Sequence, residues 1–332
     1  MTAHPKCSVI IPTYNRGYIL EQSVNSVLAQ TFTDYELIIV DDGSTDDTAR
    51  LVWRILESGR AGADRIRYFS QEQQGKSAAL NHGVSVAAGE WIAFLDSDDL
   101  WLPNKLEWQF RALQQFPACD VCFTDSQYTN NPQLDITAFR RAGRKHEGTV
   151  GIIRDALGFV INEPHGIHIQ SVLVRATRMR EVGGFDPHLR VLEDHDLIFR
   201  LAQAVTRFCY VNQPLVAIDR TPKRDVGLIE LLARDEIRLE QQQYMYEKWL
   251  TMNGLHKVIR RQIRRYLRAV YSGWANWHLE QQQYEQAREA MATAIRHEFT
   301  PTMAMKWALT AAVPGLTRRY LAERELRPSL GN

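Results

Sequence analysis

Three aspartates follow an apolar segment in the first third of the sequence. Residues Trp91–Trp101 read WIAFLDSDDLW, so a run that is expected to form a buried strand ends in Asp96, Asp98 and Asp99. Carboxylates placed so close together repel one another unless a cation binds there, and hard oxygen ligands suit Mg²⁺ or Mn²⁺. Such an ion is usually held by one or two carboxylates and by substrate phosphates. The segment therefore predicts a metal and phosphate site.

The same residues also have a purely structural interpretation. Clusters of Asp and Ser after strands form turns and cap helices, and Pro103 with Asn104 is typical of a helix start. A calcium-binding helix-loop-helix fits less well, because Leu100 cannot ligate and Trp101 cannot make the turn that needs Gly. On this segment alone, the capped turn and the metal site both stay open.

A second group of carboxylates, Glu193, Asp194 and Asp196, begins a predicted helix that runs through Leu201. An ionised carboxylate can act as a general base toward a hydroxyl group. A helix start favours negative charge by about 0.3–1 kcal/mol, which helps to keep a carboxylate ionised. The alternative is a charged first turn that only caps the helix.

The elements that must position these carboxylates alternate between strand and helix. Apolar runs predict strands at Cys7–Ile11, Tyr35–Val40, Ile66–Phe69 and from Trp91, and helical spacing predicts helices at Tyr18–Gln30, Thr45–Glu57 and Lys76–Ala88. This alternation predicts an α/β fold with a mostly parallel sheet covered on both faces. Ligands of such sheets bind at the carboxyl ends of the strands, where Thr13, Asp42 and Asp96 lie.

Two common nucleotide-binding motifs are missing from the sequence. No G-x-G-x-x-G motif follows any predicted strand, which argues against a dinucleotide-binding dehydrogenase. Gly75-Lys76-Ser77 resembles the end of a P-loop, but Ser70 stands where the motif requires its first Gly. A P-loop is therefore not supported.

The four cysteines predict a reducing, cytoplasmic setting, because they are too few for a disulfide framework and the first residues lack an apolar signal sequence. Cys119 and Cys122 have no second Cys pair or suitably spaced His for zinc, so we expect them in the core. No run reaches the roughly 18 apolar residues of a membrane span.

The formal net charge of +1 is unevenly distributed. From Leu228 onward the sequence has 16 Lys and Arg against 11 Asp and Glu, and helices are expected at Leu228–Leu250, Leu255–Gln282 and Tyr284–His297. The string KVIRRQIRRYLR, residues 257–268, is a basic amphipathic helix, which suits an anionic membrane surface. A solvated basic face is the alternative, and nucleic acid is disfavoured because no binding motif accompanies the charge.

Four ordered blocks in residues 7 to 205 carry a family resemblance. VIIPTYNRG, LIIVDDGSTDDT, GKSAALNHGVSVAAGEWIAFLDSDDLW and GGFDPHLRVLEDHDLIFRLA resemble the signature blocks of a family 2 glycosyltransferase with the GT-A fold. The resemblance implies a GT-A catalytic domain at residues 1–222, with a nucleotide-sugar half at about 1–100 and an acceptor half at about 101–222. Residues 223–332 form the expected helical region.

The resemblance also implies roles for the donor-site residues. Thr13, Tyr14 and Asp42 match positions that hold the nucleotide base and ribose, and Lys76 matches a basic position near the base or diphosphate. Asp96 is expected to face the ribose or the metal, and Asp98 the metal bound to the diphosphate. Asp99 either supports the metal shell or caps the following helix.

On the acceptor side, Asp194 matches the general base, with Glu193 and Asp196 in supporting or structural roles. One base and a single displacement imply inversion at the anomeric carbon. His165 is a candidate acceptor contact, with an ordinary loop histidine as the alternative. The polar segment Asn130–Gly148 is expected to be a loop, either acceptor-binding or only solvated.

We therefore expect a metal-dependent, inverting glycosyltransferase that uses Mn²⁺ or Mg²⁺ and a nucleotide sugar, with a UDP-sugar favoured. Its acceptor is expected to be a glycan or lipid-linked molecule of cell-surface polysaccharide biosynthesis, reached from the cytoplasm, with peripheral binding to the inner membrane face as an option. A non-catalytic nucleotide-sugar or glycan-binding module and a metal-dependent nucleotidyltransferase are the alternatives. The sugar, the nucleotide, the choice of metal and the oligomeric state stay open.

Overall fold

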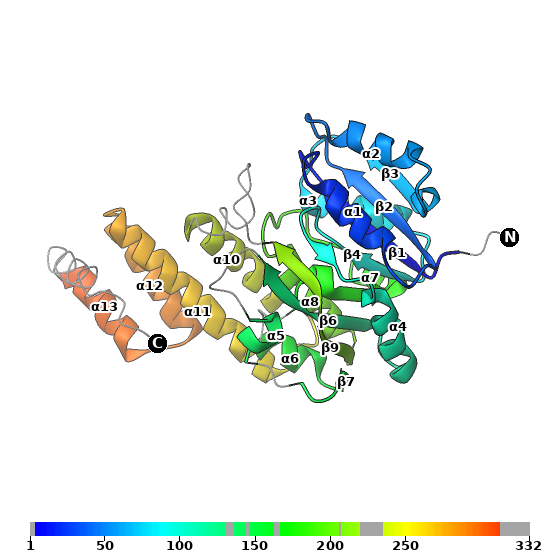
Figure 1. The fold of residues 1–332 in the computed structure, drawn as a ribbon. Helices are drawn as coiled ribbons and strands as arrows, with labels where there is room; N and C mark the ends of the chain where they lie inside the picture. Colours follow the sequence, from blue (N-terminus) through cyan, green and yellow to red (C-terminus); the bar gives the residue numbers. More distant parts are fainter. Residues whose placement is uncertain are drawn as a thin grey trace. The chain divides into compact units, whose positions relative to one another are not determined.

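The computed structural model of the protein describes residues 4–129, 136–143, 146–162, 167–205, 207–219 and 235–312. The chain divides into two compact units, Met1–Arg224 and Asp225–Asn332 (Figure 1). The predicted domain boundary at residue 222 lies outside the described residues and stays a prediction.

The first half of the first unit is a parallel sheet built from continuous apolar runs. Its strands are β1 (Cys7–Thr13), β2 (Tyr35–Asp41), β3 (Ile66–Ser70) and β4 (Trp91–Phe94), and they lie in the order β3-β2-β1-β4. The connections contain α1 (Leu20–Leu28), α2 (Thr48–Glu57), the short turn η1 (Ala63–Arg65) and α3 (Lys76–Val86).

Helices cover both faces of this parallel half, which explains why its strands are apolar at successive positions. Val9 and Leu37 share a buried cluster with side chains of α1 and α2. On the opposite face, Gly83 of α3 packs so closely against Ile10 that an added Cβ would lie 2.5 Å from Ile10 Cγ2. The predicted α/β fold class is confirmed.

The second half extends the same sheet with mixed pairing. Its strands are β5 (Leu100–Trp101), β6 (Val121–Thr129), β7 (Val150–Ile153), β8 (Val172–Arg175) and β9 (Phe208–Asp219). The full order is β3-β2-β1-β4-β8-β6-β9-β5, with β7 also paired to β9. β8 is antiparallel to β4 and β6, whereas β6 and β9 are parallel, so the parallel pattern of the first four strands does not continue.

The helices of this half connect and cover the added strands. They are α4 (Lys105–Gln115), α5 (Ala138–Arg141), α6 (Ala156–Asn162), the turn η3 (Ile169–Ser171), α7 (Ala176–Glu181) and α8 (Glu193–Ala204). The helix predicted from Thr45 begins only at Thr48, because the Asp46 carboxylate accepts a hydrogen bond from the Thr48 backbone N–H (2.9 Å).

The second unit is helical, as predicted. Its helices are α10 (Asp235–Thr251), α11 (Lys257–Glu280), α12 (Tyr284–His297) and α13 (Pro301–Ala312). Small residues let α11 and α12 approach closely, since Ala275, Ala287 and Ala294 are buried in their shared core. The predicted helix start at Leu228 lies outside the described residues. Among the helices that the structure describes, none is long and apolar enough to cross a membrane.

A buried polar network joins α4 to β6, where Gln109 Nε2 donates to the Cys122 carbonyl (3.1 Å). Lys105 is fully buried at the start of α4. Its Nζ donates to Gln109 Oε1 (2.8 Å) and lies 3.9 Å from the centre of the Trp101 ring. Burial lowers the pKa of the Lys105 ammonium to about 7. All four cysteines are free and buried, and burial raises the pKa of Cys7 to about 12.

Lys105 should make the free energy of unfolding rise with pH. Between its folded pKa of about 7 and an unfolded value of about 10.4, the unfolded chain binds more protons, so stability increases with pH by up to about 1.4 kcal/mol per unit. Lys105→Met should remove this slope in urea unfolding between about pH 7 and 8.5, below the ordinary thiol pKa. The exposed Lys257→Met variant is the control, and equal slopes in all three proteins would contradict the assignment.

Candidate active site

Asp96, Asp98 and Asp99 form a tight turn at the carboxyl end of β4. Asp96 and Asp98 are half-buried and Asp99 is buried, and the Asp99 backbone N–H donates to the Asp96 carbonyl (3.1 Å). Burial raises the pKa of Asp99 well above its usual range, and the charges of Asp98 and Asp96 raise it further. The turn therefore concentrates negative charge, as the sequence predicted.

Asp99 joins distant parts of the sheet. Its carboxyl oxygens accept hydrogen bonds from Gln170 Nε2 (2.8 Å) and from the Asp219 backbone N–H (2.9 Å). The next helix, α4, begins only at Lys105. Asp99 thus connects η3 to the end of β9, and neither of these two hydrogen bonds caps a helix.

Lys76 connects the aspartate turn to the start of α8. Its Nζ lies 2.9 Å from Asp96 Oδ1 and 3.0 Å from Glu193 Oε1. Burial alone lowers the pKa of Lys76, but the carboxylates of Asp96 and Glu193 outweigh it and raise the pKa well above its usual range. Lys76 therefore stays charged while it bridges two acidic side chains from different elements.

The start of α8 is strained and strongly charged. Leu192, the residue before the helix, adopts a left-handed backbone conformation (φ +67°), which is costly for a residue with a side chain. Glu193 is buried, and among the described residues its Oε2 has no hydrogen-bond partner. Strain and an unsatisfied buried oxygen at one point are typical of functional sites.

The pKa values of the neighbouring residues Glu193 and Asp194 are shifted in opposite directions. Burial raises the pKa of Glu193, with Lys76 opposing it and Asp194 adding to it. Burial also raises the pKa of Asp194, but His195, Lys76 and His168 together lower it below its usual value. Asp194 is therefore ionised at neutral pH, which is the state that a general base requires.

Asp196 has a separate place in the fold. It is fully buried and pairs with Arg200 one turn later (2.7 Å), and Arg200 also donates to the Val182 carbonyl (2.6 Å). This pair ties α8 to the end of α7, so Asp196 supports the fold at the base of the site.

The donor-side residues lie at the ends of β1 and β2. Asp42 is buried and accepts hydrogen bonds from Gln71 Nε2 (2.8 Å), the Gln74 N–H (2.9 Å) and the Gly75 N–H (2.7 Å). Asp42 thus fixes the loop that leads directly into Lys76. Thr13 is buried beside it, because its carbonyl accepts from the Asp42 N–H (2.9 Å).

Two side chains at this end are candidates for contact with a ligand. The Thr13 hydroxyl oxygen is buried without a hydrogen-bond partner in the described part of the chain. Tyr14, the next residue, is 38% exposed. The structure therefore brings Thr13, Tyr14 and Asp42 together, and it connects them through the 71–75 loop to Lys76 and Asp96.

Sequence reasoning missed Gln170, which connects two of the aspartates. Its Nε2 donates to Asp96 Oδ2 as well as to Asp99. No spacing or motif in the sequence distinguishes Gln170. His168 lies near Tyr128 (Oη to Nε2, 3.2 Å) and within electrostatic reach of Asp194. His165, the candidate acceptor contact, lies outside the described residues.

The segment before α8 is attached to α3. Asn81 Oδ1 accepts from the Phe185 N–H and its Nδ2 donates to the Phe185 carbonyl, both at 2.8 Å. Ser77 Oγ donates to the Leu189 carbonyl (3.2 Å). One helix therefore positions both Lys76 and the approach to Asp194.

The donor set fits a divalent cation shared with a diphosphate. Among the residues that the structure describes, no group of three or more His, Cys, Asp or Glu side chains is arranged to hold a metal ion. Asp96 and Asp98 are half-buried carboxylates in a concentration of negative charge, and such pairs bind Mg²⁺ or Mn²⁺ when phosphate oxygens complete the shell. Asp96 is also paired with Lys76 (2.9 Å), so a cation at this carboxylate would share it with the lysine.

The fold is that of the GT-A glycosyltransferases. The structure of S. aureus TarS 1-349 in complex with UDP-GlcNAc has a TM-score of 0.69 and 19% sequence identity, over 88% of this chain and 81% of that one. The mannosyltransferase PcManGT from Pyrobaculum calidifontis, in complex with GDP-Man and Mn²⁺, has a TM-score of 0.57 and 20% identity, over 96% and 84% of the two chains. At these identities the likeness establishes the fold alone.

Residues 8–162 match the family described as Glycosyl transferase family 2. It is 41% identical over 104 residues to the GalNAc(5)-diNAcBac-PP-undecaprenol beta-1,3-glucosyltransferase of Campylobacter jejuni, a match that covers 31% of this chain and 32% of the relative. The chain spans about a third of the length of several curated relatives that it matches.

Two adjacent glycines test the attachment of α3 to the segment before α8. Gly183 and Gly184 both have left-handed backbones (φ +79° and +71°), but a Cβ on Gly183 would meet open space whereas one on Gly184 would lie 2.4 Å from Asn81 Oδ1. Gly183→Ala should lower the free energy of unfolding by about 1–2 kcal/mol. Gly184→Ala should cost about 1–3 kcal/mol more, because Asn81 must move. Equal losses in urea unfolding would contradict this packing.

Proposed function

We propose that the protein is an inverting, metal-assisted glycosyltransferase that moves a sugar from a UDP-sugar to a hydroxyl group of a glycan or lipid-linked acceptor. The observation that carries the proposal is the Lys76 bridge, which connects the donor-side Asp96 to Glu193, the neighbour of Asp194. A site for a nucleotide diphosphate and a candidate base are thereby held at a fixed relation to each other.

Each residue has a defined part in this proposed reaction. The acceptor oxygen attacks the anomeric carbon of the sugar, the bond from that carbon to the diphosphate oxygen breaks, and Asp194 takes the hydroxyl proton. Inversion follows from this single displacement. Lys76 stabilises negative charge on the diphosphate side, and Thr13, Tyr14 and Asp42 hold the nucleoside. Asp98 and Asp96 would hold a Mg²⁺ or Mn²⁺ ion, which would neutralise charge on the leaving diphosphate.

Relatives support the choice of donor and acceptor class. The structural neighbour TarS was solved with UDP-GlcNAc, PcManGT with GDP-Man and Mn²⁺, and the Campylobacter relative is named for a polyprenyl diphosphate acceptor. We therefore place the reaction in cell-surface polysaccharide or glycoconjugate biosynthesis. Four free, buried cysteines favour a cytoplasmic location, where a lipid-linked acceptor would bring the protein to the inner membrane face.

The metal assignment can be tested by calorimetry with UDP, GDP and dTDP, each with and without Mn²⁺. We expect Mn²⁺-dependent binding that prefers UDP and is abolished in Asp98→Asn, because the variant loses the carboxylate that holds the ion. The exposed Asp64→Asn variant is the control and should bind as the unmodified protein does. Unchanged binding by Asp98→Asn would exclude the metal role, and no binding of any nucleotide would favour a non-catalytic module.

The base assignment predicts a selective loss of transfer. Asp194→Asn should leave UDP binding intact while transfer from UDP-sugars to polyprenyl-diphosphate glycans falls by roughly 10²-fold or more. Because the pKa of Asp194 is lowered, the unmodified enzyme should lose activity only as the pH falls through that low pKa, so kcat/KM should be flat from about pH 8 to pH 6. Retained transfer in the variant would remove Asp194 from this role.

A further inference from the structure

The first three turns of α11 carry an unusual concentration of positive charge. Residues 257–268 contain six Lys and Arg and no Asp or Glu. The apolar side chains Ile259, Ile263 and Leu267 are buried, so they set which face of the helix packs within its unit. The cations must therefore extend over the remaining surface of the helix.

Three of the six cations are already used inside the helical unit. The Arg260 guanidinium donates to the carbonyls of Leu250 (2.8 Å), Met252 (2.9 Å) and Leu255 (3.3 Å), and so satisfies the end of α10. Arg265 and Arg268 share the carboxylate of Glu298 (3.1 and 3.0 Å), which ties α11 to the end of α12.

The other three cations, Lys257, Arg261 and Arg264, form what we call the basic stripe. All three are exposed, and none has an ion-pair partner among the described residues. Their spacings of four and three residues place them within about 60° of one another around the helix, over about 10 Å of its length. The stripe also begins at the amino end of α11, where the helix dipole adds positive potential.

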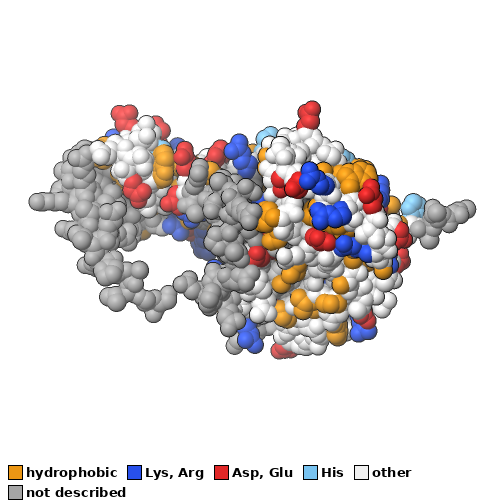
Figure 2. All heavy atoms as spheres, turned by 45° about the horizontal axis from the view of Figure 1, so that its top comes forward, with side chains coloured by type: hydrophobic (Ala, Val, Ile, Leu, Met, Phe, Trp, Pro, Cys, Tyr) orange, Lys and Arg blue, Asp and Glu red, His pale blue; other side chains and the backbone are white. Residues whose placement is uncertain are grey.

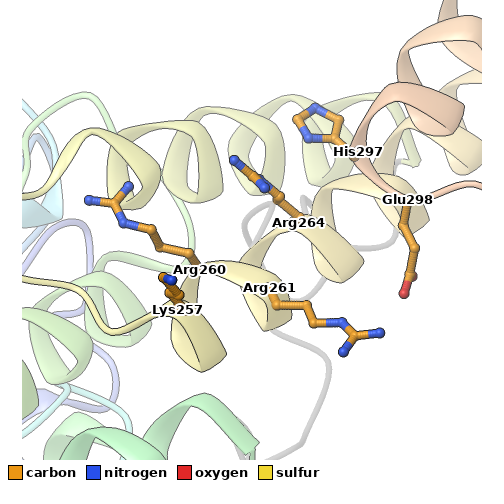
Figure 3. Close-up of a pocket in the computed structure, with 6 residues that line it drawn as sticks. All are labelled: Lys257, Arg260, Arg261, Arg264, His297 and Glu298. Atoms are coloured by element: carbon orange, nitrogen blue, oxygen red, sulfur yellow. The ribbon is translucent and has the colours of Figure 1, made fainter.

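The basic stripe borders a hollow within the helical unit. The hollow has a volume of about 570 Å³ and is lined by Lys257, Arg260, Arg261, Arg264, His297 and Glu298. Figure 3 shows the four basic side chains extending from the first turns of α11, with His297 and Glu298 at the end of α12. Because Glu298 is shared by Arg265 and Arg268, its charge does not neutralise the stripe.

Two exposed apolar side chains are sequence neighbours of residues that line this hollow. Val258 follows Lys257 and is 67% exposed, and Phe299 follows Glu298 and is 66% exposed. Exposed apolar side chains beside unpaired cations are the combination by which amphipathic helices bind the interface of an anionic bilayer. On the face of the first unit drawn in Figure 2, by contrast, basic and acidic side chains lie next to one another.

We propose that the basic stripe and its hollow bind the phosphate groups of anionic phospholipids at a bilayer surface, with Val258 and Phe299 entering the interface. The negatively charged phosphodiester headgroups would pair with the three cations. The two apolar side chains would enter the boundary between the headgroups and the acyl chains. A soluble phosphate ligand would use only the cations. This inference does not depend on the roles assigned to Asp98 or Asp194.

The test is cosedimentation of the full chain with vesicles of phosphatidylcholine alone or with about a third phosphatidylglycerol. We expect binding only to the anionic vesicles, weakened by high salt. Replacing Lys257, Arg261 and Arg264 by Gln should weaken it about 100-fold. The matched control replaces Arg50, Arg54 and Arg180, exposed arginines of the first unit, by Gln and should retain binding. Circular dichroism checks that both triple variants are folded.

Further measurements separate the membrane from other partners. Phe299→Ser should weaken vesicle binding about tenfold, because an apolar contact with the bilayer is lost. No binding of the unmodified protein to anionic vesicles, or equal losses in the two triple variants, would overturn the proposal. Binding of inorganic phosphate that depends on the basic stripe, without vesicle binding, would also overturn it and would indicate a soluble ligand.

Discussion

The site depends on one cation held between two carboxylates. Lys76 contacts Asp96 at the end of β4 and Glu193 at the start of α8; of these three side chains only that of Glu193 is fully buried. Removing Lys76 would leave the buried carboxylate of Glu193 without a compensating charge, which costs more than the net worth of the pair. This explains why α3 is attached at several further points: Asp42 orders the loop before Lys76, and Asn81 holds the segment before α8.

The position of Lys76 also contributes to the different pKa values of two adjacent acidic residues. Glu193 is buried against Lys76 and its pKa rises, whereas Asp194 is half-buried near His195 and Lys76 and its pKa falls. Two carboxylates one residue apart can therefore have different protonation behaviour, and only one suits a base at neutral pH.

The sequence allowed the parallel half of the fold to be predicted because strands that are buried on both faces appear as continuous apolar runs. The added half was harder. β5 has two residues, and β7 is only half-buried and contains Gly151, so neither has a recognisable period. Family motifs located Asp96, Asp98 and Asp194, but the contacts of Asp99 join it to Gln170 and Asp219, which are distant in sequence. The burial of Lys105 could not be predicted from the sequence either, because a lysine in a helix is ordinarily exposed.

The order of the strands also constrains the length of the segment that contains the aspartate turn. β4 and β5 are separated by β8, β6 and β9 in the sheet, a distance of about 19 Å if the sheet were flat. Only Leu95–Asp99 connects the two strands, and the hydrogen bond from Asp99 to Asp96 shortens that connection further. The sheet must therefore curl to let the chain cross. Insertions and deletions that loops elsewhere tolerate would here change the curvature of the sheet, so the length of this segment is constrained by geometry as well as by chemistry.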